Sequence, residues 1–464
     1  MSQVPGNRKR GNAAHSNRFA MHQRYVSREA FGVRRIPPLW IEPSDALNLN
    51  LSLNLNLCHR FLMLQLEEAL IQILAAVPAP TLETFPLHAA AGRILAESVQ
   101  ARIDLPPFDN SAMDGYAVRA EDLKGAKPES PVKLRLIGRI AAGQSFAGEV
   151  TSQTCVRLFT GSPLPRGADA VVMQEDTKVE PTEPDSVCIL DAPKPWESVR
   201  LQGEDIKRSQ MLAAAGDALT PGRLGLLAAS GIAQVAVGRQ PTVGIIATGS
   251  ELREAGQALG PGQLYESNRI SLVELTRRAG AIPKPFPLVA DNLSGTTTSF
   301  AQAFDQCDAV LTSGGASVGE MDFIKQAFAQ AGGDLEFWKV AIKPGRPFIF
   351  GRLRSKLLFG LPGNPVSAFV TFLLLARPAL LRWQGASEIS LPRHPGILDE
   401  PLSNPGPRRH FMRVRVDMTG HVSSAGLQVS HGISSLAAAN GLVDVPPDST
   451  LPAGATVQVL RWDL

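Results

Sequence analysis

The central part of the chain, residues 242–385, alternates short apolar runs with segments of helical spacing. The apolar runs end in glycine or polar residues, as in VGIIATG, FPLVAD and AVLTSGG. Between and after them, ISLVELTRRAG, TTTSFAQAF and DFIKQAFAQAG repeat apolar residues every three or four positions. Strands that alternate with helices predict a largely parallel sheet with helices on both faces, so the fold class is α/β. The apolar segment 365–383 adds a last long helix.

The flanking segments have other patterns. Residues 63–74 have the spacing of an amphipathic helix, and we expect a second helix near residues 88–99. Short apolar runs separated by glycine and proline turns fill residues 132–189 and 386–464, which predicts two small β-rich units. The chain therefore divides into several domains, as its 464 residues also indicate.

The first 62 residues differ from the rest because they are basic and include the period-two repeat LNLNLSLNLNL at residues 47–57. They match a transit peptide only in part, and they lack the apolar core of a secretory signal. We interpret them as a disordered extension or as the product of a wrongly chosen upstream start codon. The Leu/Asn alternation leaves one edge strand as an alternative.

Composition excludes several classes of function. The net charge of +3 is too small to indicate nucleic-acid binding. The cysteines are scattered and form no CxxC motif, which predicts no disulfide framework and no structural zinc, but reduced thiols in the cytoplasm. Residues 369–381 form the most apolar run, which is too short for a membrane span and contains Arg377 and Pro378.

The motif that organises the chain is DAVLTSGGASVGEMDFIK at residues 308–325. A buried strand leads into a glycine-rich turn, an acidic pair at Glu320 and Asp322, and a helix. At this point of an open α/β sheet, backbone N–H groups and a helix N-terminus can hold an anionic ligand. The alternative is a tight turn in which Asp322 caps the helix. The motif is neither a Walker A loop nor a dinucleotide fingerprint.

Polar residues recur where the predicted strands end. The carboxylates there are Glu251, Asp291 and Asp322, with Asp205 from an earlier loop as a further candidate, and they indicate Mg²⁺ beside a phosphate. Cations in WKVAIKPGRP would neutralise a phosphorylated ligand; they are Lys339, Lys343 and Arg346. This set favours metal-assisted cleavage or transfer at a phosphoanhydride.

Two loops outside the α/β segment are candidates for ligand contact. Residues 105–118 crowd Asp, Asn, Ser and Gly, including Asp109, into an apolar neighbourhood. Such a loop either bonds to itself or faces a ligand, and the residues leave both open. Arg200 and Asp205 flank Gly203, where an ion pair within the loop is the simpler explanation.

Seven strings, in this order, resemble the bacterial MoeA family, which is related to the C-terminal domain of gephyrin. They are FDNSAMDGYAVR, TGSPLPRGADAVVMQEDT, GEDI, TGSEL, LTSGGASVGEMDFIK, KVAIKPGRPFIFG and GLPGNPVSAF. The resemblance covers residues 63–464 and not the basic extension.

This resemblance implies insertion of molybdate into adenylylated molybdopterin, with Mg²⁺ and release of AMP. It also implies a homodimer in which the crevice of one α/β domain faces the small β domain of the other subunit. An upstream adenylyltransferase and downstream molybdoenzymes or cofactor carriers would be partners. The implied domains are an extension (1–62), a linking region (63–104 and 196–238), a small β domain (105–195), a molybdopterin-binding α/β domain (239–385) and a C-terminal β barrel (386–464).

The resemblance also implies roles for single residues. Asp205, Glu251, Asp291 and Asp322 would bind metal or act at the pyrophosphate, and Lys339 and Lys343 would bind the anionic ligand or molybdate. The partner subunit would supply Asp109, Thr160 and Arg200. The pterin and nucleotide pocket would be shaped by Ser313, Gly314, Gly315, Arg346, Pro362, Gly363, Asn364 and Pro365.

Two other functions remain open. A molybdopterin adenylyltransferase would use the same loop and require ATP, but it would not need the additional domains. A non-catalytic scaffold of the gephyrin type would not need the carboxylates.

Overall fold

The computed structural model describes residues 63–141, 143–314 and 323–463. The predicted extension, Gly315 and Asp322 lie outside the described residues. Within the described part, the strands form three six-stranded sheets and several two-stranded ribbons. These sheets correspond to the small β, α/β and C-terminal β segments that the sequence pattern predicts.

The linking region joins two stretches that are far apart in the sequence. Strand β1 (Leu82–Pro86) pairs with β12 (Gln234–Gly238), and β2 (Val99–Gln100) pairs with β11 (Met211–Ala213), both antiparallel. Helix α3 (Pro221–Ala229) follows β11 and begins at Thr220, whose side chain accepts a hydrogen bond from the Arg223 N–H. The first helix of the described chain, α2 (Leu66–Ala76), confirms the amphipathic segment near residue 63.

The prediction of a helix near residues 88–99 is wrong. Only a short 3₁₀ turn, η1 (Leu87–Ala89), forms there, and Gly92 then adopts a φ of +73°, which a right-handed helix excludes. The Leu95 N–H donates to the carbonyl of Asp217, and Arg93 is buried against the Gly238 carbonyl. The apolar spacing therefore reflects a loop that packs into the core of the linking region.

The small β domain has a sheet with strand order β7-β4-β6-β5-β9-β8. Tyr116 and Cys155 contribute to one apolar cluster, while the adjacent Ala117 and Val156 contribute to another. The period-two alternation thus buries both faces of the sheet. The elements are β4 (Gly115–Val118), η2 (Ala120–Leu123), β5 (Val132–Arg139), β6 (Thr154–Leu158), β7 (Ala170–Met173), η3 (Gln174–Asp176), β8 (Thr177–Lys178) and β9 (Ser186–Ile189).

The sheet of the α/β domain has strand order β16-β13-β17-β21-β20-β18. The first four strands are parallel, and β20 runs antiparallel to both of its neighbours. The chain leaves β13 to form β16 on one side and then returns to form β17 on the other, so a topological switch point lies between β13 and β17. The strands are β13 (Thr242–Ala247), β16 (Ile282–Pro285), β17 (Ala309–Ser313), β18 (Asp334–Lys339), β20 (Pro347–Leu353) and β21 (Lys356–Leu361).

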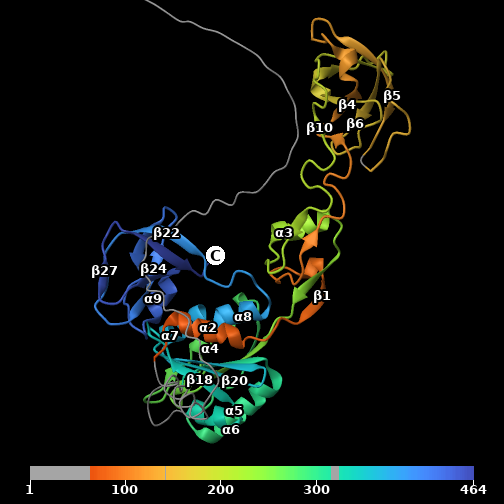
Figure 1. Ribbon diagram of the computed structural model, residues 1–464. Coiled ribbons are helices and arrows are strands. Elements are labelled where there is room, and N and C mark those ends of the chain that lie inside the picture. The colour runs from red at the N-terminus through yellow and green to blue at the C-terminus, as the bar shows by residue number, and fades with distance from the viewer. Residues whose placement is uncertain (1–62, 142, 315–322, 464) are drawn as a thin grey trace, which may run out of the picture. The chain divides into compact units, whose positions relative to one another are not determined.

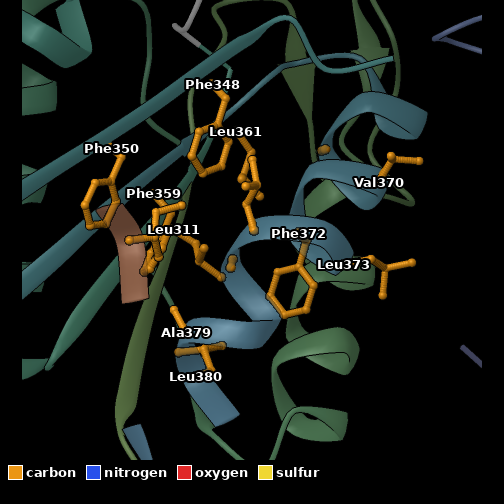
Figure 2. Packing of buried hydrophobic residues seen from close by; sticks show 14 of the residues in the cluster. Leu311, Phe348, Phe350, Phe359, Leu361, Val370, Phe372, Leu373, Ala379 and Leu380 are labelled. Carbon is orange, nitrogen blue, oxygen red and sulfur yellow. The ribbon is translucent and has the colours of Figure 1, made fainter. Parts of the chain in front are cut away.

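Helices cover both faces of this sheet, as predicted. In Figure 1, α5 (Leu293–Gln306) and α6 (Phe323–Gln330) lie on one face, and α2, α4, α7 and α8 lie on the other. Side chains such as Leu311, Phe350 and Phe359 extend from the strands toward Phe372 and Leu380 (Figure 2). The remaining helices are α4 (Asn268–Arg278), α7 (Pro365–Thr371) and α8 (Arg377–Trp383).

The long apolar helix at Pro365–Trp383 contains a π-helical segment, Phe372–Ala376, between α7 and α8. Pro378 has no N–H to donate, so the α-helical hydrogen-bond ladder cannot run through this point unchanged. By length and composition this helix could cross a membrane, but 72% of its apolar window is buried inside the fold. We assign it as a core helix because of this burial. The expectation from sequence that the apolar run is too short for a span was wrong, since the helix extends from Pro365 to Trp383.

The C-terminal domain is a closed barrel, which the family resemblance implied. Its strands pair in the ring β24-β25-β22-β28-β26, and β26 returns to β24. Short β19 (Ile342–Lys343) pairs with β24 on the outside, and β23 (Leu402–Asn404) pairs with β27 (Ser449–Leu451). The other elements are β22 (Arg393–Leu398), β24 (Arg409–Val416), β25 (His421–Ser424), α9 (Ile433–Ala438), β26 (Gly441–Val445) and β28 (Thr456–Arg461).

Candidate functional site

A pocket of about 600 Å³ lies at the carboxyl-terminal edge of the α/β sheet. Its walls come from the segments that follow β13, β16, β17 and β21, and so it sits at the switch point described above. The predicted residues that line it are Glu251, Asp291, Ser313, Gly314, Pro362, Gly363, Asn364 and Pro365. The sheet thus brings together residues that are more than 100 positions apart in the sequence.

The described part of the glycine-rich loop has little free space. Ser313 ends β17 and is buried, and Gly314 adopts a φ of +96°. A Cβ atom at Gly314 would lie 2.3 Å from the Thr248 carbonyl oxygen, so this position requires glycine on both conformational and steric grounds. The loop therefore passes close to the end of β13 before the chain enters the residues around Gly315 and Asp322 that the structure does not describe.

Asn268 connects two walls of the pocket. Its side-chain amide donates one hydrogen bond to the Ser313 hydroxyl and another to the Gly363 carbonyl, both at 2.7 Å. Sequence analysis missed this residue, because an Asn at the start of an amphipathic helix is ordinarily explained as a capping residue. Both amide hydrogens are satisfied by the protein, so Asn268 fixes the distance between the two loops.

Backbone N–H groups hold two of the carboxylates in the pocket, those of Asp291 and Glu266. An oxygen of Asp291 accepts from the Ser250 N–H at 3.1 Å, and the Asp291 N–H donates to the Ser250 hydroxyl oxygen at 3.0 Å. The parallel strands β14 (Leu252–Arg253) and β15 (Leu264–Tyr265) lie between Glu251 and Glu266, which both line the pocket. Glu266 is buried and paired with Arg269. Two of these carboxylates, Glu251 and Asp291, remain available to a ligand.

Within the described residues, no group of three or more His, Cys, Asp or Glu side chains is arranged to hold a metal ion. Mg²⁺ requires less than this, because it commonly takes one or two carboxylates together with water and substrate phosphates. Glu251 and Asp291, on one wall of a pocket that can hold a phosphate, fit that donor set. Asp322 lies outside the described residues, and Asp205 is not among the residues that line the pocket.

The predicted cations are not part of the described pocket lining. Lys339 ends β18, and its Nζ lies 3.8 Å from the centre of the Trp338 ring. Lys343 is in β19, opposite His410 of the barrel. Neither they nor Arg346 line the pocket, although the adjacent Pro347 does. Their contact with the ligand stays a prediction.

The residues expected to serve the partner subunit gather on the small β domain. Strand β3 (Asn110–Ser111) pairs with β10 (Val199–Arg200), and the Asp109 carboxylate accepts from the Gln202 N–H at 2.7 Å. Thr160 donates to Asp114 through both its N–H and its hydroxyl, and these bonds hold the pKa of Asp114 below its ordinary value. Within the loop the Asn110 amide donates to the Phe108 carbonyl and the Ser111 hydroxyl to the Met113 carbonyl, so residues 105–118 bond partly to themselves; their contact with a ligand stays a prediction.

The three described cysteines form no disulfide, as expected. Cys155 is buried, and burial raises the pKa of its thiol to about 12. A buried thiol with a raised pKa lacks the features of an activated cysteine nucleophile.

His431, from the loop between β25 and α9, is a second pocket residue that sequence analysis missed. The chain around it, VSHGISSL, gave no signal, because a single histidine in a turn is most often a surface residue. Its loop meets α7, where the Asn364 amide donates to the Ser430 hydroxyl at 3.0 Å. The C-terminal domain thus contributes to a site built mainly by the α/β domain.

Comparison with known families gives three matches in chain order. The model described as "MoeA N-terminal region (domain I and II)" matches residues 64–231. The model described as "Probable molybdopterin binding domain" matches residues 244–382, and "MoeA C-terminal region (domain IV)" matches residues 395–462. The second match contains the pocket, apart from His431.

Relatives of similar length are also known. The chain is 39% identical to the molybdopterin molybdenumtransferase of Haemophilus influenzae, over 86% of this chain and 98% of that protein. It is 40% identical to molybdopterin molybdenumtransferase 2 of Mycobacterium tuberculosis, over 82% and 95% respectively. The crystal structure of the molybdopterin biosynthesis MoeA protein from Pyrococcus horikoshii OT3 matches with a TM-score of 0.73 and 32% identity, over 86% of this chain and all of that one.

Proposed function

The chain belongs to the MoeA family of molybdopterin molybdenumtransferases, and from this premise we propose that it inserts molybdate into adenylylated molybdopterin and releases AMP with the help of Mg²⁺. The observation that carries the proposal is the pocket at the switch point, where a tightly packed glycine loop faces two available carboxylates. A phosphoanhydride needs both a backbone that can approach closely and a metal that can share its charge.

We assign the roles as follows. Glu251 and Asp291 would hold Mg²⁺, with Asp322 and Asp205 as further candidates, and the bound Mg²⁺ would stabilise negative charge on the phosphate oxygens. Ser313 and Gly314 would contact the ligand from one wall and Gly363 and Asn364 from the other. Lys339, Lys343 and Arg346 would attract the anionic substrates, molybdate included.

The wider setting of the reaction is part of the same proposal. The protein would act in the cytoplasm, on a pterin delivered by a molybdopterin adenylyltransferase, and pass its product to molybdoenzymes or cofactor carriers. It would work as a homodimer, with Asp109, Thr160 and Arg200 of one subunit facing the crevice of the other. The cluster that these residues form on the small β domain supports this arrangement.

The decisive experiment measures AMP release from adenylylated molybdopterin, without ATP, in the presence and absence of molybdate and Mg²⁺. We expect release that requires both ions. A reaction that instead consumes ATP and molybdopterin would indicate the adenylyltransferase, and no turnover by a folded protein would indicate the scaffold. Glu251→Gln should reduce AMP release by on the order of a hundredfold, comparable to the loss of one electrostatic stabiliser.

The shared site has its own test. Asp109→Asn and Asp291→Asn chains would each be inactive as homodimers. Refolded together in equal amounts, about half the dimers would be mixed, and each would contain one intact site, so about a quarter of the wild-type activity should return. If mixed dimers form and activity does not rise above that of the single variants, then Asp109 and Asp291 do not act across an interface.

A further inference from the structure

A second cavity, of about 390 Å³, lies apart from the pocket at the switch point. It is lined by residues of α4, of the π-helical part of the long apolar helix and of the chain at the end of β28, and the two cavities share no lining residue. Its walls are largely apolar and include Leu275, Phe372 and Trp462. The ring of Trp462 packs edge-on against that of Phe369, with centroids 5.4 Å apart, so α7 holds this wall in place.

Three arginines also line this cavity, and two of them already have an acidic partner. Arg461 donates through two nitrogens to the carboxylate of Asp463, at 2.7 and 2.6 Å. Arg278 donates through Nε to Glu274 at 3.1 Å. The third, Arg377, has no carboxylate within ion-pair distance among the described residues. Its charge is therefore the one in the lining that the described protein leaves unbalanced.

The guanidinium of Arg377 has hydrogen-bond donors that the described protein does not use. Nη1 donates to the Ile389 carbonyl at 2.9 Å, whereas Nε and Nη2 bond to none of the described residues. Neither of these two nitrogens is among the fully buried atoms that lack a partner, so a ligand can reach both. Burial nevertheless lowers the pKa of Arg377, because the fold withdraws much of the side chain from water. A half-buried charge with an open edge of donors is stabilised by an anion that binds there.

The backbone next to Arg377 supports a role in binding. The π-helical segment Phe372–Ala376 ends immediately before Arg377, and its first two residues, Phe372 and Leu373, also line the cavity. Such segments are rare in proteins, and they occur frequently at functional sites. The cavity thus coincides with the one π-helical segment of the described chain.

We propose that this cavity binds a small organic carboxylate. The edge formed by Nε and Nη2 of Arg377 is the planar fork that binds the two oxygens of a carboxylate through parallel hydrogen bonds. A carboxylate has one negative charge, which matches the one unbalanced arginine, whereas a phosphate ester would bring up to two. The apolar part of the ligand packs against Phe372 and Trp462, and the volume of the cavity suits a small molecule.

The test uses the full-length protein and measures dissociation constants by ligand-observed NMR at constant ionic strength, so that screening does not differ between samples. Benzoate is the probe, and benzyl alcohol, which has nearly the same shape but no charge, is its control. Acetate lacks the ring and tests the apolar walls. For the wild type we expect benzoate to bind with a Kd on the order of 1 mM. The other two should bind about tenfold more weakly.

The variant Arg377→Gln removes the fork, and Arg382→Gln is the matched control. Arg382 lies on the same helix, α8, is exposed and does not line the cavity. We expect Arg377→Gln to weaken benzoate binding about tenfold and to leave the binding of benzyl alcohol unchanged. A variant that only distorted the cavity would weaken both ligands. The control should bind benzoate like the wild type.

Arg377→Lys is the milder second variant. It keeps the charge and a donor for the Ile389 carbonyl but lacks the planar fork, so benzoate binding should weaken several-fold. The proposal is overturned if benzoate binds the wild type no more tightly than benzyl alcohol, or if both folded Arg377 variants bind benzoate as the wild type does. Phenyl phosphate that binds more tightly than benzoate would overturn the choice of a carboxylate. The proposed function is independent of these results, because the two cavities share no residue.

Discussion

Asn268 allows a sharp test of how the pocket is built. Asn268→Ala removes two hydrogen bonds, to the Ser313 hydroxyl and to the Gly363 carbonyl. At about 1 kcal/mol each, their loss should cost about 2 kcal/mol of stability, and the apparent melting temperature should fall by several degrees. The glycine loop and the Gly363 loop would no longer be held at a fixed separation. Since displacements of about 1 Å can cost on the order of a hundredfold in rate, we expect AMP release to fall by ten- to a hundredfold.

The matched control is Asn440→Ala. Asn440 is also half-buried and also makes two hydrogen bonds, with the carbonyl and the N–H of Val416, but it lies in the barrel away from the pocket. It should lose similar stability and keep nearly normal activity. The assay is thermal unfolding together with AMP release at a temperature where both variants are folded. Equal activity losses in the two variants would refute the reasoning, because they would show that Asn268 contributes general stability alone.

Three further predictions concern single positions. Gly314→Ala should abolish AMP release in a protein that still folds, because the new Cβ atom would meet the Thr248 carbonyl oxygen; normal turnover would contradict the close approach. Asp291→Asn should raise the Mg²⁺ concentration needed for half-maximal AMP release; an unchanged Mg²⁺ dependence would remove Asp291 from the metal site. Burial beside Lys343 lowers the pKa of His410 from 6.5 to about 4, so the unfolded chain takes up a proton first as the pH falls. The free energy of unfolding, measured with urea at each pH, should therefore drop by up to about 3 kcal/mol between pH 6.5 and 4. His410→Leu should make this pH dependence shallower, and parallel plots for wild type and variant would contradict the prediction.

The sequence was sufficient for the parts of the site that follow from local pattern. Apolar runs that end in polar residues predicted strands, and parallel strands place their carboxyl ends at one edge of the sheet. Glu251, Asp291, Ser313 and Asn364 accordingly meet in one pocket. No tertiary information is needed for this step, because the βα alternation alone fixes the direction of the strands.

The order of the strands in the sheet is harder to predict from the sequence. In the observed order, the strand that ends with Lys339 lies away from the pocket. Lys339 ends β18, which runs parallel to β21 but lies beyond β20 in the sheet. With strands about 4.8 Å apart, two steps place it about 10 Å from β21. The antiparallel β20 begins at the same edge, which explains why its first residue, Pro347, lines the pocket instead. The sequence pattern predicts both strands but not their order in the sheet.

The helix predicted near residues 88–99 does not form, for a related reason. Its apolar residues have helical spacing, but Leu95 bonds to the backbone of Asp217, more than 100 residues away. A prediction from helix propensity uses only neighbouring residues in the sequence, and pairing with distant residues can override it. His431 escaped prediction for the same reason: its importance comes from the approach of a separate domain.

The charged residues of the pocket are thus placed by secondary structure, whereas the residues that fix its geometry are placed by tertiary hydrogen bonds. Glu251 and Asp291 follow strands and could be found by pattern, whereas Asn268 and Asn364 use side-chain amides to join loops that the sheet leaves independent. Amides suit this work because they can donate to neighbouring carbonyl and hydroxyl oxygens without adding charge to a pocket that already contains carboxylates. Replacing Asn268 with Asp should therefore be at least as damaging as Ala, since it would set a carboxylate oxygen against the Gly363 carbonyl. Asn268→Asp with higher AMP release than Asn268→Ala would show that the shape of the side chain, and not its donor hydrogens, holds the two loops.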